Sequence, residues 1–294
     1  MIEIALALYL ILTVYVFFVL IYQIGYKRNK LIFVNKKLRL YFFTFVVFLY
    51  AMYIEPNMIV IRETPIEVWF DAKIVVLSDI HLWEVKKSQF LQRVVDKVNL
   101  QKDIDFVVIA GDFTFLRDKK PNLDHLFFPL RDIKVPIYAV LWNHDTKNPG
   151  PDIEKALIAS LKKYKVQLLD NEKTIFSKKN IHILWLWDNW IPNDKVEMIH
   201  DYKKEDNLIV IAHNPDTLLK YKNTIPDITI SGHTHGWQLR IPYLYKAVIP
   251  CVASFDRWLE MYNENKVFIS SGLGEVGLPM RILNPPVIDI LDFN

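Results

Sequence analysis

Five short segments of this 294-residue chain carry polar side chains of related chemistry, and each segment follows an apolar run. The segments are Asp79-Ile80-His81, Gly111-Asp112, Asn143-His144-Asp145, His213 and Gly232-His233-Thr234-His235. Carboxylate, imidazole and amide groups supply the oxygen and nitrogen atoms that divalent Mn, Fe, Zn and Mg accept. Five of the eight histidines fall in these segments. The residue types therefore predict a site for divalent metal ions, built from distant parts of the chain.

Each of these segments comes directly after a predicted strand. Short runs rich in Val and Ile are typical of buried strands, and here they are Lys73–Leu77, Phe106–Ala110, Ile137–Leu141, Ile181–Leu186, Leu208–Ala212, Ile228–Ser231 and Val267–Ser270. In open α/β sheets, ligands bind at the carboxyl ends of the strands. We therefore expect the polar side chains to converge on one point, although they span positions 79 to 235.

Two amphipathic stretches lie between the predicted strands. Ser88–Leu100 places five apolar side chains on one helical stripe, and Ser88 is its predicted N-cap. Ile153–Tyr164 repeats the pattern. Strands that alternate with helices indicate a layered α/β fold.

Taken singly, each polar segment is a weak signal. A single His after a strand is more often a hydrogen-bonded core or loop residue, and a Gly-Asp pair is a common turn. His125, His182 and His200 are interpreted in that way, as surface or packing residues. All five segments in one chain, each at a strand end, favour a metal site over coincidence.

The five segments together resemble the motif blocks of the calcineurin-like metallophosphoesterase family, and its membrane-anchored bacterial branch in particular. The resemblance covers about residues 71–291, including Ser271-Gly272-Leu273-Gly274 and Leu278-Pro279-Met280-Arg281. It implies an α/β fold in the form of a four-layer αββα sandwich. It also implies a centre of two divalent metal ions, for which Mn, Fe, Zn and Mg are all suitable.

The resemblance further implies a role for each site residue. The implied ligands are Asp79, His81 and His235 for one metal ion and Asn143, His213 and His233 for the other, with Asp112 bridging the two. His144 is implied to lie over the phosphate and to assist the leaving group. Asp145 is implied to orient His144.

The chain departs from the family pattern at three positions beside the expected site. Trp83, Trp142 and Trp237 stand where the family usually has Gly. One interpretation is an aromatic rim that stacks a base or grips an acyl chain. The other is that the native protein carries glycine there, because some bacterial genetic codes read UGA as glycine. The low content of eight Gly fits that interpretation, and Trp in a turn that needs a positive φ would be strained.

The N-terminal residues predict a membrane anchor. Ile4–Tyr22 is a run of 19 residues without a charge, long enough to span a hydrocarbon core of roughly 30 Å. Leu40–Ile54 is a second apolar run, of 15 residues. Snorkelling of Arg39 and extension by Met58–Ile61 would make it a second span, and an interfacial helix is the alternative. We therefore divide the chain into an anchor of one or two transmembrane helices, residues 1–56, and a phosphoesterase domain, residues 57–294.

The charge distribution predicts the orientation of this anchor. Residues 1–54 hold six basic residues against Glu3, a net of +5, and the remainder carries a net of −2. The positive-inside rule places the basic loop between the two runs in the cytoplasm. With two spans the catalytic domain is extracytoplasmic, and with one span it lies on the opposite side. The domain itself has no basic surplus, so we expect no nucleic-acid partner.

The predicted function is two-metal hydrolysis of a phosphomonoester, phosphodiester or pyrophosphate, with a lipid-linked or envelope substrate and the membrane as partner. One alternative is a pyrophosphatase of the UDP-2,3-diacylglucosamine type on the cytoplasmic face. The other is a metal-binding scaffold without catalysis, against which the His144-Asp145 pair argues. Cys251 is the single cysteine. It excludes an internal disulfide and a Cys-based zinc cage, and we expect it to be buried and inert.

Overall fold

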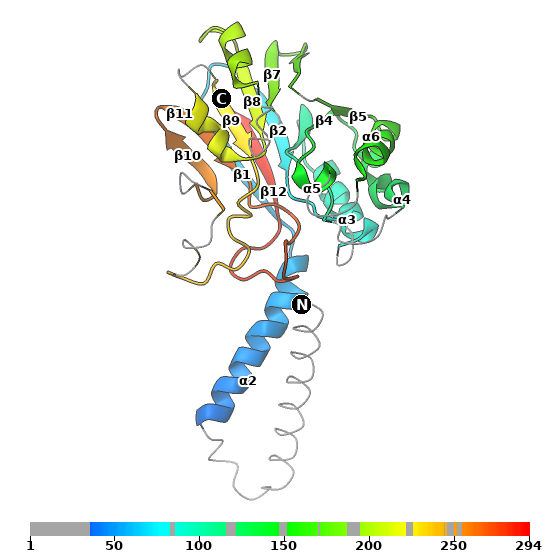
Figure 1. Cartoon of the computed structure of the whole chain (residues 1–294), viewed down its shortest axis with the longest axis vertical. Coiled ribbons are helices and arrows are strands. Elements are labelled where there is room, and N and C mark those ends of the chain that lie inside the picture. The colour runs from blue at the N-terminus through cyan, green and yellow to red at the C-terminus, as the bar shows by residue number, and fades with distance from the viewer. Residues whose placement is uncertain are drawn as a thin grey trace, which may run out of the picture.

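The computed structural model describes residues 36–82, 86–115, 122–146, 152–169, 171–186, 195–221, 226–243, 245, 250–251 and 255–294. In this part of the chain two six-stranded mixed sheets pack face to face, and a helix extends away from them at one end (Figure 1). The predicted α/β class is confirmed by these mixed sheets.

The first sheet has the strand order β1-β12-β2-β3-β4-β5. Its strands are β1 (Val60–Ile66), β2 (Ala72–Leu77), β3 (Phe106–Ile109), β4 (Ile137–Ala139), β5 (Val166–Leu168) and β12 (Val287–Phe293). Neighbouring strands are parallel except for the antiparallel pair β12 and β2. The carboxyl ends of β2, β3 and β4 therefore lie at one edge of the sheet.

The second sheet has the order β10-β11-β9-β8-β7-β6. Its strands are β6 (Lys173–Phe176), β7 (Ile181–Leu186), β8 (Leu208–Ala212), β9 (Ile228–Ser231), β10 (Trp258–Tyr262) and β11 (Asn265–Ile269). The four central strands are parallel, and β6 and β10 are antiparallel edges. The ends of β8 and β9 thus meet at one edge as well.

One hydrophobic core lies between the two sheets. Alternate residues of β2 and β3, such as Ile74 and Val108, face alternate residues of β7 and β8, such as Ile183 and Ile211. The other face of the first sheet packs against helices α3 (Ser88–Asn99), α4 (Leu123–Phe127) and α6 (Glu154–Lys163). Both faces are therefore apolar, which explains why these strands read as continuous Val and Ile runs.

The outer face of the second sheet has a thinner cover. Two 3-10 helices, η4 (Val196–Asp201) and η5 (Pro215–Lys220), supply Ile199 and Leu218 to small clusters on β7, β8 and β11. The remaining short helices are η3 (Phe128–Asp132), which contacts α3, and α5 (Asn143–Thr146), which follows β4.

The predicted elements agree with the structure apart from their ends and caps. The predicted runs match β7, β8 and β9 residue for residue, and Ser88 is the first residue of helix α3. The predicted N-cap at Ser88 is wrong, because the N-cap residue is Lys87. The side chain of Lys87 makes no capping hydrogen bond to the helix. Strands β1 and β12 were not predicted. They carry charged or polar residues, and each completes the sheet through a partner far away in sequence.

The N-terminal described segment is a continuous helical stretch. Helix α2 (Lys36–Leu49) passes into a π-helical turn η1 (Tyr50–Ile54) and a 3-10 turn η2 (Glu55–Asn57). No helix in the described ranges has the length and apolarity to cross a membrane. The predicted extension through Met58–Ile61 is wrong, because Val60 and Ile61 pair with β12. The predicted span Ile4–Tyr22 lies outside the described residues.

One buried carboxyl group of β12 predicts a pH-dependent stability. Asp289 accepts a hydrogen bond from Ser270 Oγ at 2.7 Å, and Arg62 Nη1 lies 3.9 Å from its Oδ1. No described residue makes a hydrogen bond to that Oδ1. Burial raises the pKa of Asp289 to about 7, against about 3.9 in an unfolded chain. The folded state therefore binds this proton more tightly, and its stability falls as pH rises from about 4 to about 7.

We expect Asp289→Asn to increase the free energy of unfolding at pH 8 by about 1–3 kcal/mol, because it removes a buried charge with an unpartnered oxygen. The gain should vanish near pH 4. Urea unfolding at both pH values, at fixed Mn²⁺, measures this. A variant that is destabilised at pH 8 would show that Asp289 is held as a stabilising charge by Arg62.

Candidate metal centre

The predicted site residues converge from both sheets. Asp79 and His81 lie on the turn after β2, Asp112 follows β3, and His144 and Asp145 lie on α5 after β4. His213 follows β8, and His233 and His235 follow β9. The helix α5 also carries Asn143, whose side chain is outside the described part of the structure. The site thus forms where the carboxyl ends of the parallel strands of the two sheets meet.

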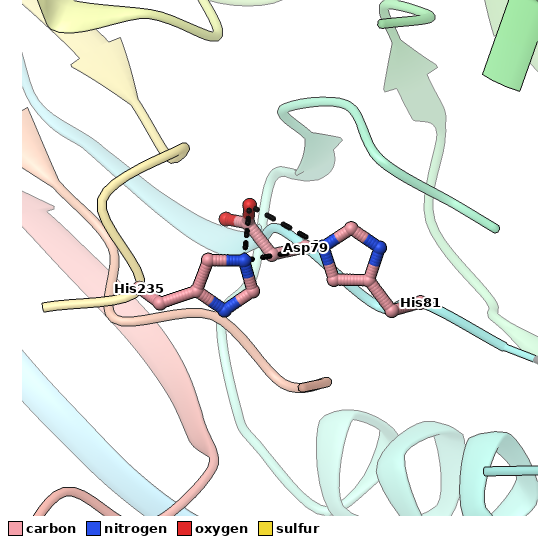
Figure 2. A group of neighbouring side chains, drawn as sticks. All are labelled: Asp79, His81 and His235. Atoms are coloured by element: carbon pink, nitrogen blue, oxygen red, sulfur yellow. Dashed lines mark hydrogen bonds and ion pairs between the residues drawn. The ribbon is translucent and has the colours of Figure 1, made fainter. Parts of the chain in front are cut away.

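One group of potential metal ligands consists of Asp79, His81 and His235. Their ligand atoms lie within 4.8 Å of one another, and Figure 2 shows the two imidazoles and the carboxylate pointing to a common point. His235 Nε2 is 3.3 Å from Asp79 Oδ1 and 3.2 Å from His81 Nε2. Two nitrogen lone pairs this close, with a carboxylate beside them, form a donor set that fits a divalent cation.

A second group joins Asp79, Asp112 and His213, again within 4.8 Å. Asp112 Oδ2 lies 3.4 Å from His213 Nε2, 3.5 Å from His81 Nε2 and 3.9 Å from His144 Nε2. Both Asp112 Oδ1 and His213 Nε2 are buried without a hydrogen-bond partner among the described residues. Buried polar atoms of this kind fit ligation of a cation. Asp112 thus contacts His81 of the first group as well as His213 of the second, as a bridging ligand requires, and Asp79 belongs to both groups.

The orientation of two imidazoles is fixed by backbone carbonyl groups. Nδ1 of His81 lies 3.2 Å from the carbonyl oxygen of Thr114, and Nδ1 of His213 lies 2.5 Å from that of Ala110. A ring that donates from Nδ1 presents the lone pair of Nε2 to the site. Both rings are therefore oriented with Nε2 toward the site.

The ligand turns have an uncommon backbone conformation. Positive φ angles of 46° to 68° occur at five predicted ligands, namely Asp79, His81, Asp112, His233 and His235. Such angles cost a non-glycine residue free energy and occur mainly at functional sites, where the surrounding structure enforces them. The positive φ angles therefore indicate that the site constrains the backbone of these turns.

Glycines permit the close approach of the turns. A Cβ atom at Gly232 would lie 1.9 Å from Ser78 Oγ, and one at Gly272 would lie 2.8 Å from Asp79 Cβ. Gly272 also has a φ of +71°. No side chain larger than hydrogen fits at these two positions without moving Asp79. The Ser271-Gly272-Leu273-Gly274 segment, which resembles a family motif, thus packs directly against the ligand Asp79.

The electrostatic environment keeps most of the imidazoles in the ligating form. Burial lowers the pKa of His81 to about 3 and that of His233 to about 4, and it also lowers the pKa of His235. These rings are therefore neutral at pH 7, with a free lone pair for a cation.

His213 differs from these three imidazoles. Burial acts to lower its pKa, but the carboxylates of Asp112 and Asp79 outweigh burial and raise the pKa to about 9. The neighbouring imidazoles in turn hold the pKa of both carboxyl groups below the usual range, against the effect of burial. His213 therefore carries a proton that a bound cation would displace.

His144 and Asp145 occupy distinct environments. His144 Nε2 faces Asp112, and its side chain is 15% exposed. Its Nδ1 is buried and has no hydrogen-bond partner in the described part of the chain. The carboxylate of Asp145 accepts hydrogen bonds from the backbone N–H groups of Phe113, Thr114 and Trp142 at 2.9–3.2 Å. Asp145 thus joins the turns after β3 and β4, and any effect on His144 acts through the backbone of α5.

Comparison with known proteins decides the family. The Calcineurin-like phosphoesterase family matches residues 72–237, more than half of the chain. The chain belongs to the calcineurin-like phosphoesterase family. Members of this family are metal-dependent phosphoester hydrolases, and the His/Asp clusters can bind two metal ions. The metal could be any of several divalent ions, because the ligand types suit them all.

Three relatives of this phosphoesterase illustrate the range of similarity. It is 28% identical to the metallophosphoesterase YkuE of Bacillus subtilis over 82% of this chain and 87% of YkuE. It is 24% identical to the phosphodiesterase YaeI of Escherichia coli over 75% of this chain and 81% of YaeI. It is 28% identical to a transmembrane protein with metallophosphoesterase domain from Danio rerio, over 78% of this chain and 55% of the relative.

The three tryptophans at family glycine positions differ in their surroundings. Trp142 is buried, and its ring lies 4.6 Å from that of His213, so it packs beneath a ligand instead of lining a rim. Its Nε1 is buried, and none of the residues that the structure describes hydrogen-bonds to it. Trp237 is half-buried with a φ of +46°, an outlier for a bulky side chain. Trp83 lies outside the described residues. Mass spectrometry of peptides from the native organism distinguishes tryptophan from glycine at these positions.

Cys251 has no part in this chemistry. The thiol is free and half-buried, less covered than expected from the sequence. Burial raises the pKa of the Cys251 thiol well above its usual range, so the group stays protonated and weakly nucleophilic at neutral pH.

The sequence did not indicate a further set of residues that hydrogen-bonds to the backbone of a ligand. Asn284 is buried, and its Nδ2 donates to the carbonyl oxygen of His235 at 2.6 Å, while its Oδ1 accepts from Arg257 at 2.6 Å. The backbone N–H of Asn284 donates to Glu55 Oε1 at 2.5 Å. Asn and Glu at these positions carry no sequence signal, because their partners lie 49 and 229 residues away.

We expect Asn284→Ala to weaken metal binding at Asp79, His81 and His235 by about 10- to 100-fold, as loss of a hydrogen bond behind a ligand does. Turnover at saturating Mn²⁺ should change much less. Calorimetric Mn²⁺ titration measures the first effect. Asn284→Asp keeps the size but not the N–H donor and should match the alanine variant. The matched control Asn265→Ala removes a buried Asn outside the site and should bind Mn²⁺ normally. Equal loss in that control would mean a general effect on folding.

Proposed function

We propose that this protein is a membrane-anchored binuclear-metal phosphoesterase whose substrate is a phosphomonoester, phosphodiester or pyrophosphate of a lipid or envelope component. The observation that carries the proposal is the position of Asp112. Its carboxylate lies 3.4–3.9 Å from the imidazoles of His213, His81 and His144. A carboxylate with imidazoles of both ligand groups around it would serve as the shared ligand of two cations.

The residues divide into ligands and a proton donor. Asp79, His81 and His235 would hold one ion, and Asn143, His213 and His233 would hold the other, with Asp112 as a ligand of both. Two such ions would lower the pKa of a water molecule and stabilise negative charge on the phosphoryl oxygens. His144 is placed beside the bridging carboxylate with partial solvent access, so it can give a proton to the leaving oxygen. Asp145 positions His144 through the backbone of α5.

Two relatives support the finer parts of the proposal. YaeI is named a phosphodiesterase, which favours a diester among the three ester types. The relative from Danio rerio is named a transmembrane protein, which supports an anchor in a chain whose own N-terminus holds a 19-residue uncharged apolar run.

The full-length protein tests this function directly. With Mn²⁺ we expect hydrolysis of a chromogenic phosphodiester such as bis-p-nitrophenyl phosphate, and loss of that activity on treatment with a chelator followed by recovery on adding Mn²⁺. A protein that binds two metal ions yet hydrolyses neither monoester, diester nor pyrophosphate would be a scaffold, and the proposal would fail.

The anchor predicts on which side of the membrane the site lies. The basic residues between Tyr22 and Leu40 hold that loop in the cytoplasm. If Leu40–Ile54 crosses the bilayer, a reporter that is active only outside the cytoplasm gives signal when fused after Asn294. Signal from a cytoplasmic reporter at the same point, with none from the other, would reverse the side. The cytoplasmic UDP-2,3-diacylglucosamine-type substrates would then become the leading candidates.

A further inference from the structure

Three segments meet at the end of the body from which α2 extends. They are the helical turns Tyr50–Asn57, the loop 238–243 and the loop 276–284 (Figure 1). The backbone N–H of Arg281 donates to the carbonyl oxygen of Ala51 at 2.9 Å, and that of Ile282 donates to Gln238 at 2.8 Å. A further backbone hydrogen bond, from Arg240 to Ile282 at 3.0 Å, pairs the two loops. The three segments therefore form one connected surface.

This surface exposes large apolar side chains. Ile241, Tyr243, Leu278 and Leu283 are 46%, 96%, 40% and 65% exposed, and we call these four residues the apolar rim. Helix α2 and its π-helical turn continue the apolar surface, with exposed Leu40, Phe42, Phe43, Val46, Tyr50, Tyr53 and Ile54. Single exposed apolar residues are ordinary, but a continuous set marks an interaction surface.

Charged groups in the same segments point inward or are paired. Arg281 is fully buried, with Glu275 at 3.3 Å. Arg240 makes two hydrogen bonds to the carboxylate of Asp256. The rim thus presents apolar side chains while the cations beside it are neutralised within the protein. A surface of this kind suits a hydrocarbon boundary better than water.

The chain itself indicates which partner covers the rim. From Lys36 to Ile54 the helix has 19 residues, a length of about 28 Å. Basic residues stand at its start and the rim at its other end. Apolar side chains between a basic end and a body are the pattern of a helix in contact with lipid. The rim is continuous with that helix, so the same lipid surface can receive both.

The rim is also connected to the metal ligands. The loop that carries Leu283 continues into Asn284, which donates to the carbonyl oxygen of His235. The loop that carries Leu278 begins near Gly274. The backbone N–H of Gly274 donates to the backbone carbonyl oxygen of Asp79 at 2.6 Å. A lipid surface at the rim is therefore adjacent to the metal centre.

We propose that the apolar rim of Ile241, Tyr243, Leu278 and Leu283 inserts into the lipid–water interface and presents the metal centre to phosphate esters at the level of the lipid head groups. This inference rests on the proposed phosphoesterase function and specifies where the substrate is bound. Interfacial segments bury their apolar face about 5–10 Å into the boundary of head groups and acyl chains. The phosphate ester of a lipid head group and the metal centre then lie on the same side of the rim.

Depth-dependent quenching tests the insertion without using activity. The full-length chain with Cys251→Ser and Leu278→Cys is labelled with an environment-sensitive fluorophore and reconstituted into vesicles of phosphatidylcholine and phosphatidylglycerol that contain a nitroxide lipid. Trp69→Cys in the same background is the matched control, because Trp69 is 89% exposed and lies beyond the opposite end of β1. We expect quenching at position 278 and none at position 69. Equal quenching at both positions, or none at position 278, overturns the proposal.

A rim variant tests the consequence for catalysis. Replacement of the four rim residues by serine should lower kcat/KM for an ester embedded in the vesicles by about tenfold or more, because misplacement of a site costs at least that much. Hydrolysis of soluble bis-p-nitrophenyl phosphate should be unchanged. Equal loss on both substrates would show that the rim supports the fold, and would overturn the proposal. If the parent chain hydrolyses no soluble ester, the proposed function fails, while the quenching experiment still decides the fate of the rim.

Discussion

Asp112→Ala is expected to abolish phosphoesterase activity, with a loss of at least about 10³-fold. Asp112 Oδ2 lies within 3.9 Å of three imidazoles, which include His81 of the first ligand group and His213 of the second. Without it the two groups share only the carboxylate of Asp79, which belongs to both. The variant should therefore hold fewer than two metal ions per chain after dialysis, as measured by plasma mass spectrometry.

Two further variants separate charge from packing in this result. Asp112→Asn keeps the shape of the side chain but not its charge, and it should lose activity and metal as the alanine variant does. Asp289→Asn removes another buried carboxylate outside the metal cluster, and it should retain both metals and full turnover. Two bound ions with near-normal turnover in Asp112→Ala would show that the site has been assigned to the wrong residues.

His144→Ala is expected to keep both metal ions and to lower kcat by about 10²–10⁴-fold, the usual contribution of a positioned proton donor. His144 lies at the edge of the cluster, with its Nε2 3.9 Å from Asp112 and its side chain partly exposed. The loss should be largest for alkyl esters, because an alkoxide leaving group needs a proton. It should be small for nitrophenyl esters, whose leaving group departs as an anion.

The matched control is His182→Ala. His182 lies on the second sheet and packs against Tyr202, with ring centroids 5.4 Å apart. It belongs to neither group of potential metal ligands in the described residues. This variant should retain normal kcat for both ester types. If His144→Ala reduces kcat equally for nitrophenyl and alkyl esters, His144 does not act as the proton donor and instead supports the metal centre.

Sequence alone was sufficient for the central strands and for the types of the ligands. Strands β7, β8 and β9 are buried on both faces, so their Val- and Ile-rich runs stand out from the flanking polar residues. Parallel strands place their carboxyl ends at one edge, and ligands that follow those ends are therefore predictable as a group. That rule brought Asp79 and His235 together, although they lie 156 positions apart.

The tertiary structure decided the features that depend on partners far away in the chain. Strand β1 carries Arg62 and Glu63 and has no apolar run, and it becomes a strand because Val60–Ile66 pairs with Val287–Phe293. Asn284 and Glu55 acquire their role behind His235 only when the two ends of the domain meet. Hydrogen bonds and ion pairs of this kind depend on positions in space, and no local periodicity encodes them. The sequence by itself therefore determined which chemistry the protein can do, and the fold decided which groups hold that chemistry in place.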